Sequence, residues 1–229
     1  MRARRLAGAA LAIVLIALLT GLGIWQLERL AWKRALIAQV EQRLSAPPVA
    51  APGPARWASI GPSDAYSRVR VSGRYRAGQD ILVQAVTDLG GGYWLLTPIE
   101  TASGWSVLVN RGFVPTDARK ALSRTPAEPV TVTGLLRVTE PGGGFLRHND
   151  PATDRWYSRD VAAIAARHGI ATAAPYFIDA DRSGAGWPRG GMTVVRFPNN
   201  HLVYALTWFA LAGLFAFLLL RAVRKGGEG

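Results

Sequence analysis

Three histidines are the first candidates for chemistry in this 229-residue chain, which contains no cysteine. The lack of cysteine excludes disulfides, thiolate metal sites and a cysteine nucleophile. His148 precedes two aspartates, Asp150 and Asp154, and such a cluster could serve a hydrolase or bind a metal ion. No nucleophile elbow, zinc-type histidine pair or phosphate loop accompanies it, so we expect that the protein is not an enzyme. An enzyme that uses His148 and Asp150 remains the alternative.

His201 differs from the other two histidines because it directly precedes an uncharged apolar run, Leu202 to Leu220. A polar side chain at the edge of a membrane span is costly unless it is paired or functional. Imidazole is the usual nitrogen ligand of haem iron, so an iron ligand is one interpretation. The other is a histidine that caps the span and bonds to Asn199 or Asn200. The residue types alone favour this second interpretation.

Two apolar runs, one near each end of the chain, determine where His201 and its neighbours lie. Leu6 to Trp25 is a 20-residue stretch without a charge, and Leu202 to Leu220 is a 19-residue stretch. At a rise of about 1.5 Å per residue, each can cross a hydrocarbon core about 30 Å thick, which predicts two transmembrane helices. A cleaved signal peptide fits the first run less well, because the run is too long for an h-region and no cleavage site follows it.

Both chain ends should then lie on one side of the membrane, with the 176 residues from Gln26 to His201 on the other. The basic residues that flank the first span nearly balance, so they do not decide the orientation. The formal net charge of +12 is spread along the chain without an aromatic-and-basic recognition signature. We therefore expect contact with membrane lipid or an acidic partner, and no binding of nucleic acid.

The sequence between the spans predicts one β-rich domain. Helical spacing continues from the first span to about Leu44, and prolines then mark residues 45–65 as a linker. From residue 66 the apolar residues alternate with a period of two, which is typical of β-strands. Strands are expected at residues 66–75, 81–87, 93–101, 105–114, 130–138, 176–179 and 193–197, and one clear helix at residues 158–168.

Short strands with brief connections favour a mostly antiparallel sheet, either closed into a barrel or packed by a helix. The predicted fold class is therefore an α+β membrane protein, in which two terminal transmembrane helices flank a barrel-like β domain. The expected organisation is a tail (1–5), a span (6–25), the linker (45–65), the β-rich domain (66–198), a second span (199–220) and a second tail (221–229).

Four short motifs are more specific than this general pattern. They are Gly23–Lys33 after the first span, Val109–Pro115 in a strand, Trp156-Tyr157 with Asp160 at the internal helix, and Asn199–Phe209 at the second span. In this order, between two terminal spans, they strongly resemble the surfeit locus protein 1 family. Members of that family are assembly factors of haem-copper cytochrome c oxidase in bacteria and mitochondria. The resemblance covers nearly the whole chain apart from the linker and the tails.

The resemblance implies an orientation and a function. It implies a periplasmic central domain with both termini cytoplasmic. The five residues before the first span leave no room for a transit peptide, so a bacterial inner membrane is expected. It implies a non-enzymatic role in maturing oxidase subunit I. Haem A synthase is a further candidate partner. For bacterial members it implies haem a bound as cargo, with the histidine that corresponds to His201 as its proposed ligand. The alternative is a cofactor-free scaffold that stabilises an oxidase assembly intermediate.

The geometry of the spans supports a haem site at His201. The chain leaves the membrane at Trp25 and re-enters it at His201, so both residues should lie at one interface. Arg29 follows Trp25 by four residues, and Trp32 and Lys33 follow Arg29 by three and four, so these residues are expected on one helical face. The haem ring could rest on Trp25 and its iron on His201, while its propionates meet Arg29 or Lys33. The alternatives are an aromatic belt for the tryptophans and lipid phosphate for the two cations.

Other motif residues carry weaker expectations. Gln26 and Asn200 could serve the polar edge of the haem ligand. Asn110 and Arg111 precede Gly112, which permits a close approach of backbone. Arg111 could contact a partner, although an internal ion pair with Asp150 or Asp160 is favoured. The residues expected to organise the loop before the internal helix are Asn149, Trp156, Tyr157 and Asp160.

Overall fold

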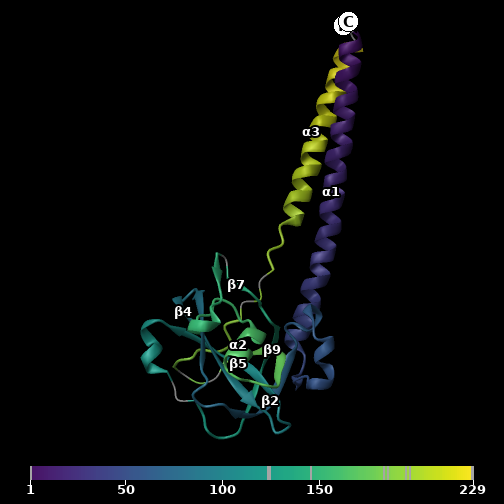
Figure 1. Ribbon diagram of the computed structural model, residues 1–229. Helices are drawn as coiled ribbons and strands as arrows, with labels where there is room; N and C mark the ends of the chain where they lie inside the picture. The colour runs from purple at the N-terminus through teal and green to yellow at the C-terminus, as the bar shows by residue number, and fades with distance from the viewer. Residues whose placement is uncertain are drawn as a thin grey trace. The chain divides into compact units, whose positions relative to one another are not determined.

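The structure, a computed structural model, describes residues 2–122, 125–144, 146–182, 184, 186–193, 195 and 197–227. The chain divides into two compact units (Figure 1). The helical unit comprises residues 1–39 and 195–229, and the β unit comprises residues 40–194. The fold class is α+β, as expected from the sequence, because the chain consists of an N-terminal helix, then a barrel-like sheet, then a C-terminal helix.

The helical unit consists of most of α1 (Arg2–Ser45) and all of α3 (His201–Gly227), which run antiparallel (Figure 1). The predicted continuation of the first helix to about Leu44 is therefore confirmed. Small residues line the seam: Ala205 and Ala212 of α3 are buried, and a Cβ atom on Gly23 would lie 2.5 Å from the ring of Phe209. Small side chains at such a seam let two helix backbones approach closely.

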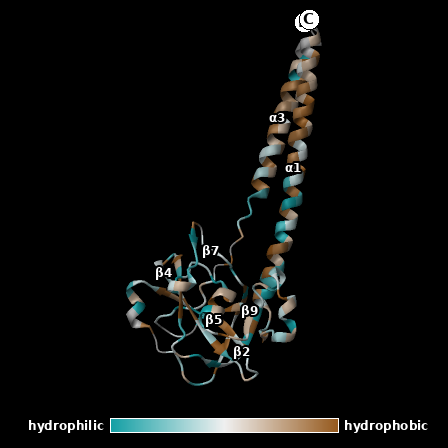
Figure 2. Cartoon of the chain, in the orientation of Figure 1, coloured by the Kyte–Doolittle hydropathy of each residue, from teal (hydrophilic) through white to brown (hydrophobic). Residues whose placement is uncertain are grey.

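Outside this seam both helices expose large apolar side chains. Leu11 and Leu18 of α1 are 61% and 58% exposed, and Phe217 of α3 is 59% exposed. Figure 2 shows that hydrophobic residues dominate most of α3 and the corresponding length of α1. By length and composition both helices are long and apolar enough to cross a membrane. Such a surface is stable only in contact with an apolar medium or partner.

The β unit is built on a seven-stranded sheet. Its strands are β1 (Val49–Ala50), β2 (Arg68–Tyr75), β3 (Ile81–Thr87), β4 (Gly90–Glu100), β5 (Ser106–Pro115), β6 (Val130–Val138) and β9 (Ala173–Ala180). Five of them form a closed circuit in the order β2, β6, β9, β5, β4, because β4 also pairs with β2. The pairs β1–β2 and β5–β9 are parallel and the others antiparallel, so the predicted mostly antiparallel, barrel-like sheet is confirmed.

Shorter elements complete this unit. They are the 3₁₀ helices η1 (Pro54–Ser59), η2 (Pro62–Asp64), η3 (Asp117–Ala121) and η4 (Pro151–Thr153), the hairpin strands β7 (Gly143–Gly144) and β8 (Arg147–His148), and the helix α2 (Val161–Arg167). The predicted internal helix is thus present, with Asp160 as its N-cap and His168 as its C-cap. Its apolar stripe of Val161, Ile164 and Ala165 is buried.

The core of the β unit lies on both faces of the sheet. Adjacent residues of β9, Tyr176 and Phe177, belong to two different buried clusters, because side chains alternate along a strand. The cluster around Phe177 also contains Trp156 and the buried stripe of α2. The helix therefore covers one sheet face, and Trp156 anchors the loop that leads into it.

The segment 45–65, expected to be a linker, is folded onto this core. Strand β1 pairs with β2, and the ring of Trp57 meets that of Trp105 edge-on with centroids 6.0 Å apart. The carbonyl oxygen of Pro52 accepts hydrogen bonds from the indole of Trp57 and, at 2.7 Å, from the hydroxyl of Tyr176. Burial also raises the pKa of Tyr176, so this hydroxyl remains a donor. Proline content had indicated an extended linker, but these contacts make the segment part of the β unit.

Two late strands differ from expectation. The strand expected at residues 176–179 is longer, because Ala173 at the start of β9 also pairs with Ser106 of β5. The strand expected at residues 193–197 is absent at Thr193, Val195 and Phe197, while positions 194 and 196 lie outside the described residues. Alternating apolar residues there had suggested a strand, but such a pattern stabilises a strand only where a neighbouring strand is available to pair.

Candidate functional site

His201 contacts Gln26 across the helical unit. The Nδ1 atom of His201, the first residue of α3, lies 2.7 Å from the Oε1 atom of Gln26 on α1, 175 positions earlier in the chain. Both side chains are partly buried. The capping partners expected for His201 were Asn199 and Asn200, and the structure shows Gln26 in that role instead. The backbone carbonyl of Asn200 accepts from the amide of Tyr204, so Asn200 begins α3.

This hydrogen bond decides which ring nitrogen of His201 can act as a ligand. The amide oxygen of Gln26 can only accept, so Nδ1 of His201 carries the proton in this contact. In the neutral imidazole, Nε2 then holds the free electron pair. Among the described residues none forms a hydrogen bond with Nε2. Metal-binding histidines commonly have one ring nitrogen held by such a hydrogen bond, so this geometry is compatible with a ligand role for Nε2.

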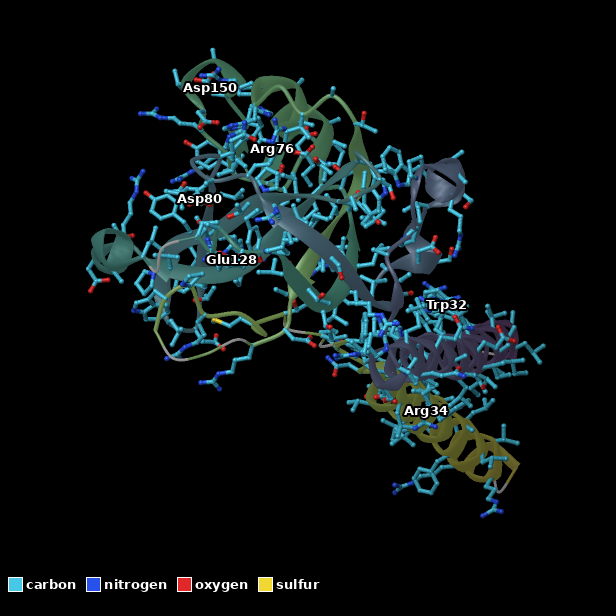
Figure 3. The ribbon with its side chains drawn as sticks, turned by 90° about the horizontal axis from the view of Figure 1, so that it is seen from below. Trp32, Arg34, Arg76, Asp80, Glu128 and Asp150 are labelled. Carbon is cyan, nitrogen blue, oxygen red and sulfur yellow. The ribbon has the colours of Figure 1, made fainter. Side chains whose placement is uncertain are left out.

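The cations and tryptophans of α1 lie within two turns of Gln26. The guanidinium of Arg29 stacks over Trp32 at 4.5 Å, and the ammonium of Lys33 lies 5.5 Å from the ring centre of Phe197. Trp25 and Trp32, the latter labelled in Figure 3, are 50% and 53% exposed. Gln26 and Lys33, seven residues apart, share the face towards α3. The stripe of Trp25, Arg29 and Trp32 lies about 100° further round the helix.

These residues fit a haem by their chemistry. An imidazole nitrogen with a free electron pair can bind iron, Lys33 and Arg29 can neutralise propionates, and exposed tryptophan rings can pack against a porphyrin. Two buried polar atoms of the same unit, Asn199 Oδ1 and Trp208 Nε1, have no hydrogen-bond partner among the described residues. Trp208 follows His201 by seven residues and so lies on the same face of α3. Most buried polar atoms in proteins have a hydrogen-bond partner, so these two atoms are available to bond with a ligand.

A second polar cluster lies inside the β unit around Asp179, which is only 5% exposed. Its carboxylate accepts from the amide of Asn110 at 2.7 Å, from Arg137 at 2.8 Å and from the hydroxyl of Thr193 at 2.8 Å. Arg159 lies 3.6 Å away and also binds Glu140 through two nitrogens. Asn110 therefore positions a buried carboxylate, and the two arginines are neutralised by the two acids.

Sequence reasoning missed this cluster apart from Asn110. The signal that could have revealed it is the presence of charged residues inside strands that are otherwise apolar. Arg137 interrupts β6 and Asp179 interrupts β9, and these strands are neighbours in the sheet. A charge in a buried strand position requires a partner of opposite sign.

Gly112 is required by close backbone contact. Its φ is +136°, and a Cβ atom there would lie 2.2 Å from the carbonyl of Arg189. Phe113 and Arg189 exchange two backbone hydrogen bonds of 2.9 Å, which bring the two segments together. The expectation of a close backbone approach at Gly112 thus agrees with the geometry.

Arg111 occupies a bulge between β4 and β5. Leu95 faces Gly112 and Leu96 faces Asn110, so Arg111 has no partner residue on β4. Its expected ion pair with Asp150 or Asp160 is wrong, because its guanidinium lies 3.9 Å from Asp80 instead. It also donates to Thr125 at 2.7 Å and lies 5.2 Å above the ring of Tyr75. Burial raises the pKa of Tyr75, and the Arg111 cation opposes this shift only in part.

The other motif residues hold the loop before α2. The side chain of Asp160 accepts from the amide of Ala163 and so caps the helix. Asn149 accepts from the amides of Tyr157 and Ser158 at 2.8 and 3.1 Å. Trp156 is 2% exposed. Asn149, Trp156, Tyr157 and Asp160 therefore stabilise this loop and the start of α2, as expected from the sequence.

Among the residues that the structure describes, no hydrogen bond or ion pair joins His148 to Asp150, the pair of the alternative enzyme site. His148 is exposed on β8, and Asp150 caps η4 by accepting from Ala152 and Thr153. Its hydrogen bond with the Thr153 hydroxyl is the main reason why the pKa of Asp150 is lowered. Asp154 instead holds His168 and the indole of Trp156 at 2.9 and 2.7 Å. Burial opposes ionisation of Asp154, but these two bonds outweigh it and lower its pKa.

Comparison with known proteins finds relatives along most of the chain. A family model described as the SURF1 family matches residues 13–213. Surfeit locus protein 1 of Rattus norvegicus is 33% identical over 88% of this chain and 71% of its own length. The Homo sapiens protein of the same name is 32% identical over 91% and 75% of the two chains. A SURF1-like protein of Monosiga brevicollis is 33% identical over 91% and 84%.

Proposed function

This chain belongs to the SURF1 family, and we propose that it assists the assembly of a haem-copper cytochrome c oxidase by holding haem a for subunit I. The observation that carries the proposal is the hydrogen bond between His201 Nδ1 and Gln26, which leaves Nε2 of His201 as a free ligand. Haem a, when bound, would supply an iron atom for that nitrogen and two propionates for nearby cations.

The proposed setting is a bacterial inner membrane crossed by α1 and α3. Their exposed apolar side chains support insertion, since such a surface is unfavourable in water. With both termini cytoplasmic, His201 would lie at the periplasmic end of its span, near the level where α1 leaves the membrane. Membrane lipid is then a partner of both helices, and haem A synthase is a candidate source of the cargo. The role requires no catalysis by this chain.

Each residue near His201 has a defined task in this proposal. His201 would bind the iron through Nε2, because Gln26 holds its Nδ1 atom by a hydrogen bond. Lys33 and Arg29 would neutralise the propionates, and the exposed ring of Trp25 would pack against the porphyrin. Asn200 begins α3 and thereby places His201 in the first turn of the helix.

The test is an absorption spectrum of the full-length protein purified from cells that make haem a. We expect a haem signal in the wild type and its loss in His201→Ala, because the iron loses its nitrogen ligand. The matched control is His148→Ala, which removes an exposed imidazole from β8 and should keep the signal. An unchanged spectrum in His201→Ala would show that His201 is not the ligand.

Gln26→Leu should weaken haem binding by about 10- to 100-fold, which is the usual effect of losing an outer hydrogen bond to a metal ligand. Gln26→Glu should bind at least as tightly as the wild type, because a carboxylate accepts the Nδ1 proton more strongly than an amide. Titration with haem a of each purified variant measures both affinities. Gln39→Leu, an exposed change on the same helix, is the control. Equal affinities for Gln26→Leu and the control variant would contradict the positioning role.

A cofactor-free scaffold is the second candidate, and the same hydrogen bond favours it. A polar pair between two membrane helices contributes roughly 0.5–2 kcal/mol to their association without any ligand. This function predicts co-purification with oxidase subunit I or haem A synthase and no absorption band at any stage. The spectrum of the wild-type protein therefore distinguishes the two candidates.

A further inference from the structure

A cavity of about 430 Å³ lies in the β unit, and none of the residues assigned to haem lines it. Its walls include Tyr75, Arg111, Val132, Thr133, Trp187 and Pro188. Its volume is in the range of small-ligand sites, which usually combine apolar walls with a few polar groups. Of the Asn110-Arg111-Gly112 motif, only Arg111 lines this cavity, and the other two residues line a different one.

The guanidinium of Arg111 has hydrogen-bond donors to spare. Its side chain is only 10% exposed. One terminal nitrogen donates to Thr125, while Asp80 at 3.9 Å is too far for a hydrogen bond. Within the part of the chain that the structure describes, its Nε atom and second terminal nitrogen have no acceptor. Nine-tenths burial of a cation with unused donors is costly, and an acceptor in the cavity would remove that cost.

The two acids near Arg111 have other partners as well, although Asp80 also forms an ion pair with Arg111 at 3.9 Å. Asp80, labelled in Figure 3, accepts from the hydroxyls of Thr97 and Thr125. Asp181 lines the cavity, but its carboxylate pairs with Arg68. Arg182, exposed at the rim, adds a further positive charge. Three arginines (Arg68, Arg111 and Arg182) and two aspartates (Asp80 and Asp181) lie at or beside the cavity, so their formal charges sum to +1, which an anion would complement.

The bulge explains why this arginine faces the cavity. An extra residue in one strand is left out of the ladder, which redirects its side chain, and such bulges are frequent beside binding sites. The ring of Tyr75 lies 5.2 Å from the guanidinium and limits its movement. The ring of Trp187 is held edge-on against Phe113, with centroids 6.4 Å apart, and supplies a flat apolar wall.

We propose that this cavity binds a carboxylate carried on a flat apolar body, with Arg111 as the anion-binding residue. The Nε atom and the free terminal nitrogen of a guanidinium form a fork that matches the two oxygens of a carboxylate. The apolar body would pack against Trp187 and Pro188. The carboxylate could belong to a small organic acid or to the C-terminus of a partner protein, and both present the same chemistry to Arg111.

Calorimetric titration of the full-length protein in detergent tests the proposal with 2-naphthoate as the probe. We expect saturable binding of 2-naphthoate and at least about tenfold weaker binding of uncharged 2-naphthamide, because the amide cannot form the charged fork. The dipeptide Gly-Trp with a free carboxyl group, compared with its amide, forms the second arm. Tighter binding of the dipeptide acid than of naphthoate identifies a protein terminus as the source, and the reverse order identifies a small acid.

Three variants show whether the binding uses this cavity. Arg111→Gln should weaken 2-naphthoate binding by about tenfold or more, whereas Arg70→Gln, which removes an exposed arginine of β2, should leave it unchanged. Trp187→Ala removes the apolar wall with Arg111 in place, and should weaken 2-naphthoate and 2-naphthamide alike. Equal binding by Arg111→Gln and wild type, equal binding of acid and amide, or no saturation would overturn the proposal. If Arg111→Gln fails to fold, the Trp187→Ala variant provides the test instead. Unchanged binding of 2-naphthoate by Trp187→Ala would also overturn the proposal.

Discussion

Asp179→Asn is expected to lower the free energy of unfolding of the β unit by about 3–5 kcal/mol, the usual cost of breaking a buried ion pair. The carboxylate of Asp179 is 5% exposed and lies 2.8 Å from Arg137 and 3.6 Å from Arg159. Without its charge, two largely buried arginines share only Glu140. An asparagine keeps only one side-chain oxygen, so its NH2 group would face either the amide donor of Asn110 or the donors of Arg137 and Thr193.

The matched control is Asp181→Asn, two residues further along the chain. Asp181 pairs with Arg68, but its side chain is 42% exposed, so the pair is screened by water and should contribute about 1 kcal/mol or less. Guanidinium unfolding in detergent, followed by tryptophan fluorescence, measures both variants. Equal destabilisation by the two substitutions would mean that the cluster around Asp179 does not hold the sheet together.

Gly112→Ala is expected to destabilise the β unit by about 3 kcal/mol or more, or to prevent folding. A φ of +136° is strained for any residue with a Cβ atom, which costs about 1–3 kcal/mol. The added methyl group would also meet the backbone of Arg189 at 2.2 Å. Because backbone atoms cannot move aside like a flexible side chain, the hydrogen bonds between Phe113 and Arg189 would have to separate.

Gly91→Ala is the control for this second prediction. Gly91 lies on β4, a neighbour of β5, its φ is not in the left-handed region, and a Cβ atom there meets nothing within 4 Å. Its replacement should change stability by about 1 kcal/mol or less. The same guanidinium experiment compares the two midpoints. If Gly112→Ala unfolds at the midpoint of Gly91→Ala, close packing against Arg189 is not what requires glycine at position 112.

Most elements could be predicted because their signals are local. The uncharged runs 6–25 and 202–220 are long enough to span a membrane, and both lie in helices of the structure. The strands predicted at 81–87 and 130–138 match β3 and β6 at both ends. Apolar and polar residues that alternate with a period of two indicate a strand, because apolar residues of a helix repeat every three to four positions. The errors fall where the pattern was weak, in the proline-rich segment 45–65 and at 193–197.

For the candidate site, the sequence predicted which residues take part but not which of them contact one another. Residue type and position singled out His201 and Gln26, but as separate contributors to a ligand pocket. The structure joins them by a hydrogen bond between residues 175 positions apart. The partner of Arg111 was also wrong, since Asp80 stands there and not Asp150 or Asp160. The spacing of apolar residues along the chain does not indicate which charged side chains contact one another after folding.

By itself the sequence determined two long apolar helices, the strands between them, and the family to which the chain is similar, because length, periodicity and motif order are properties of neighbouring residues. Only the tertiary structure decided which groups meet. It closed the sheet through the β2–β4 pairing, buried Asp179 between two arginines, and turned Arg111 out of the ladder into a cavity. Such contacts depend on strand register and helix packing across many tens of residues, and a one-residue change of register would abolish them.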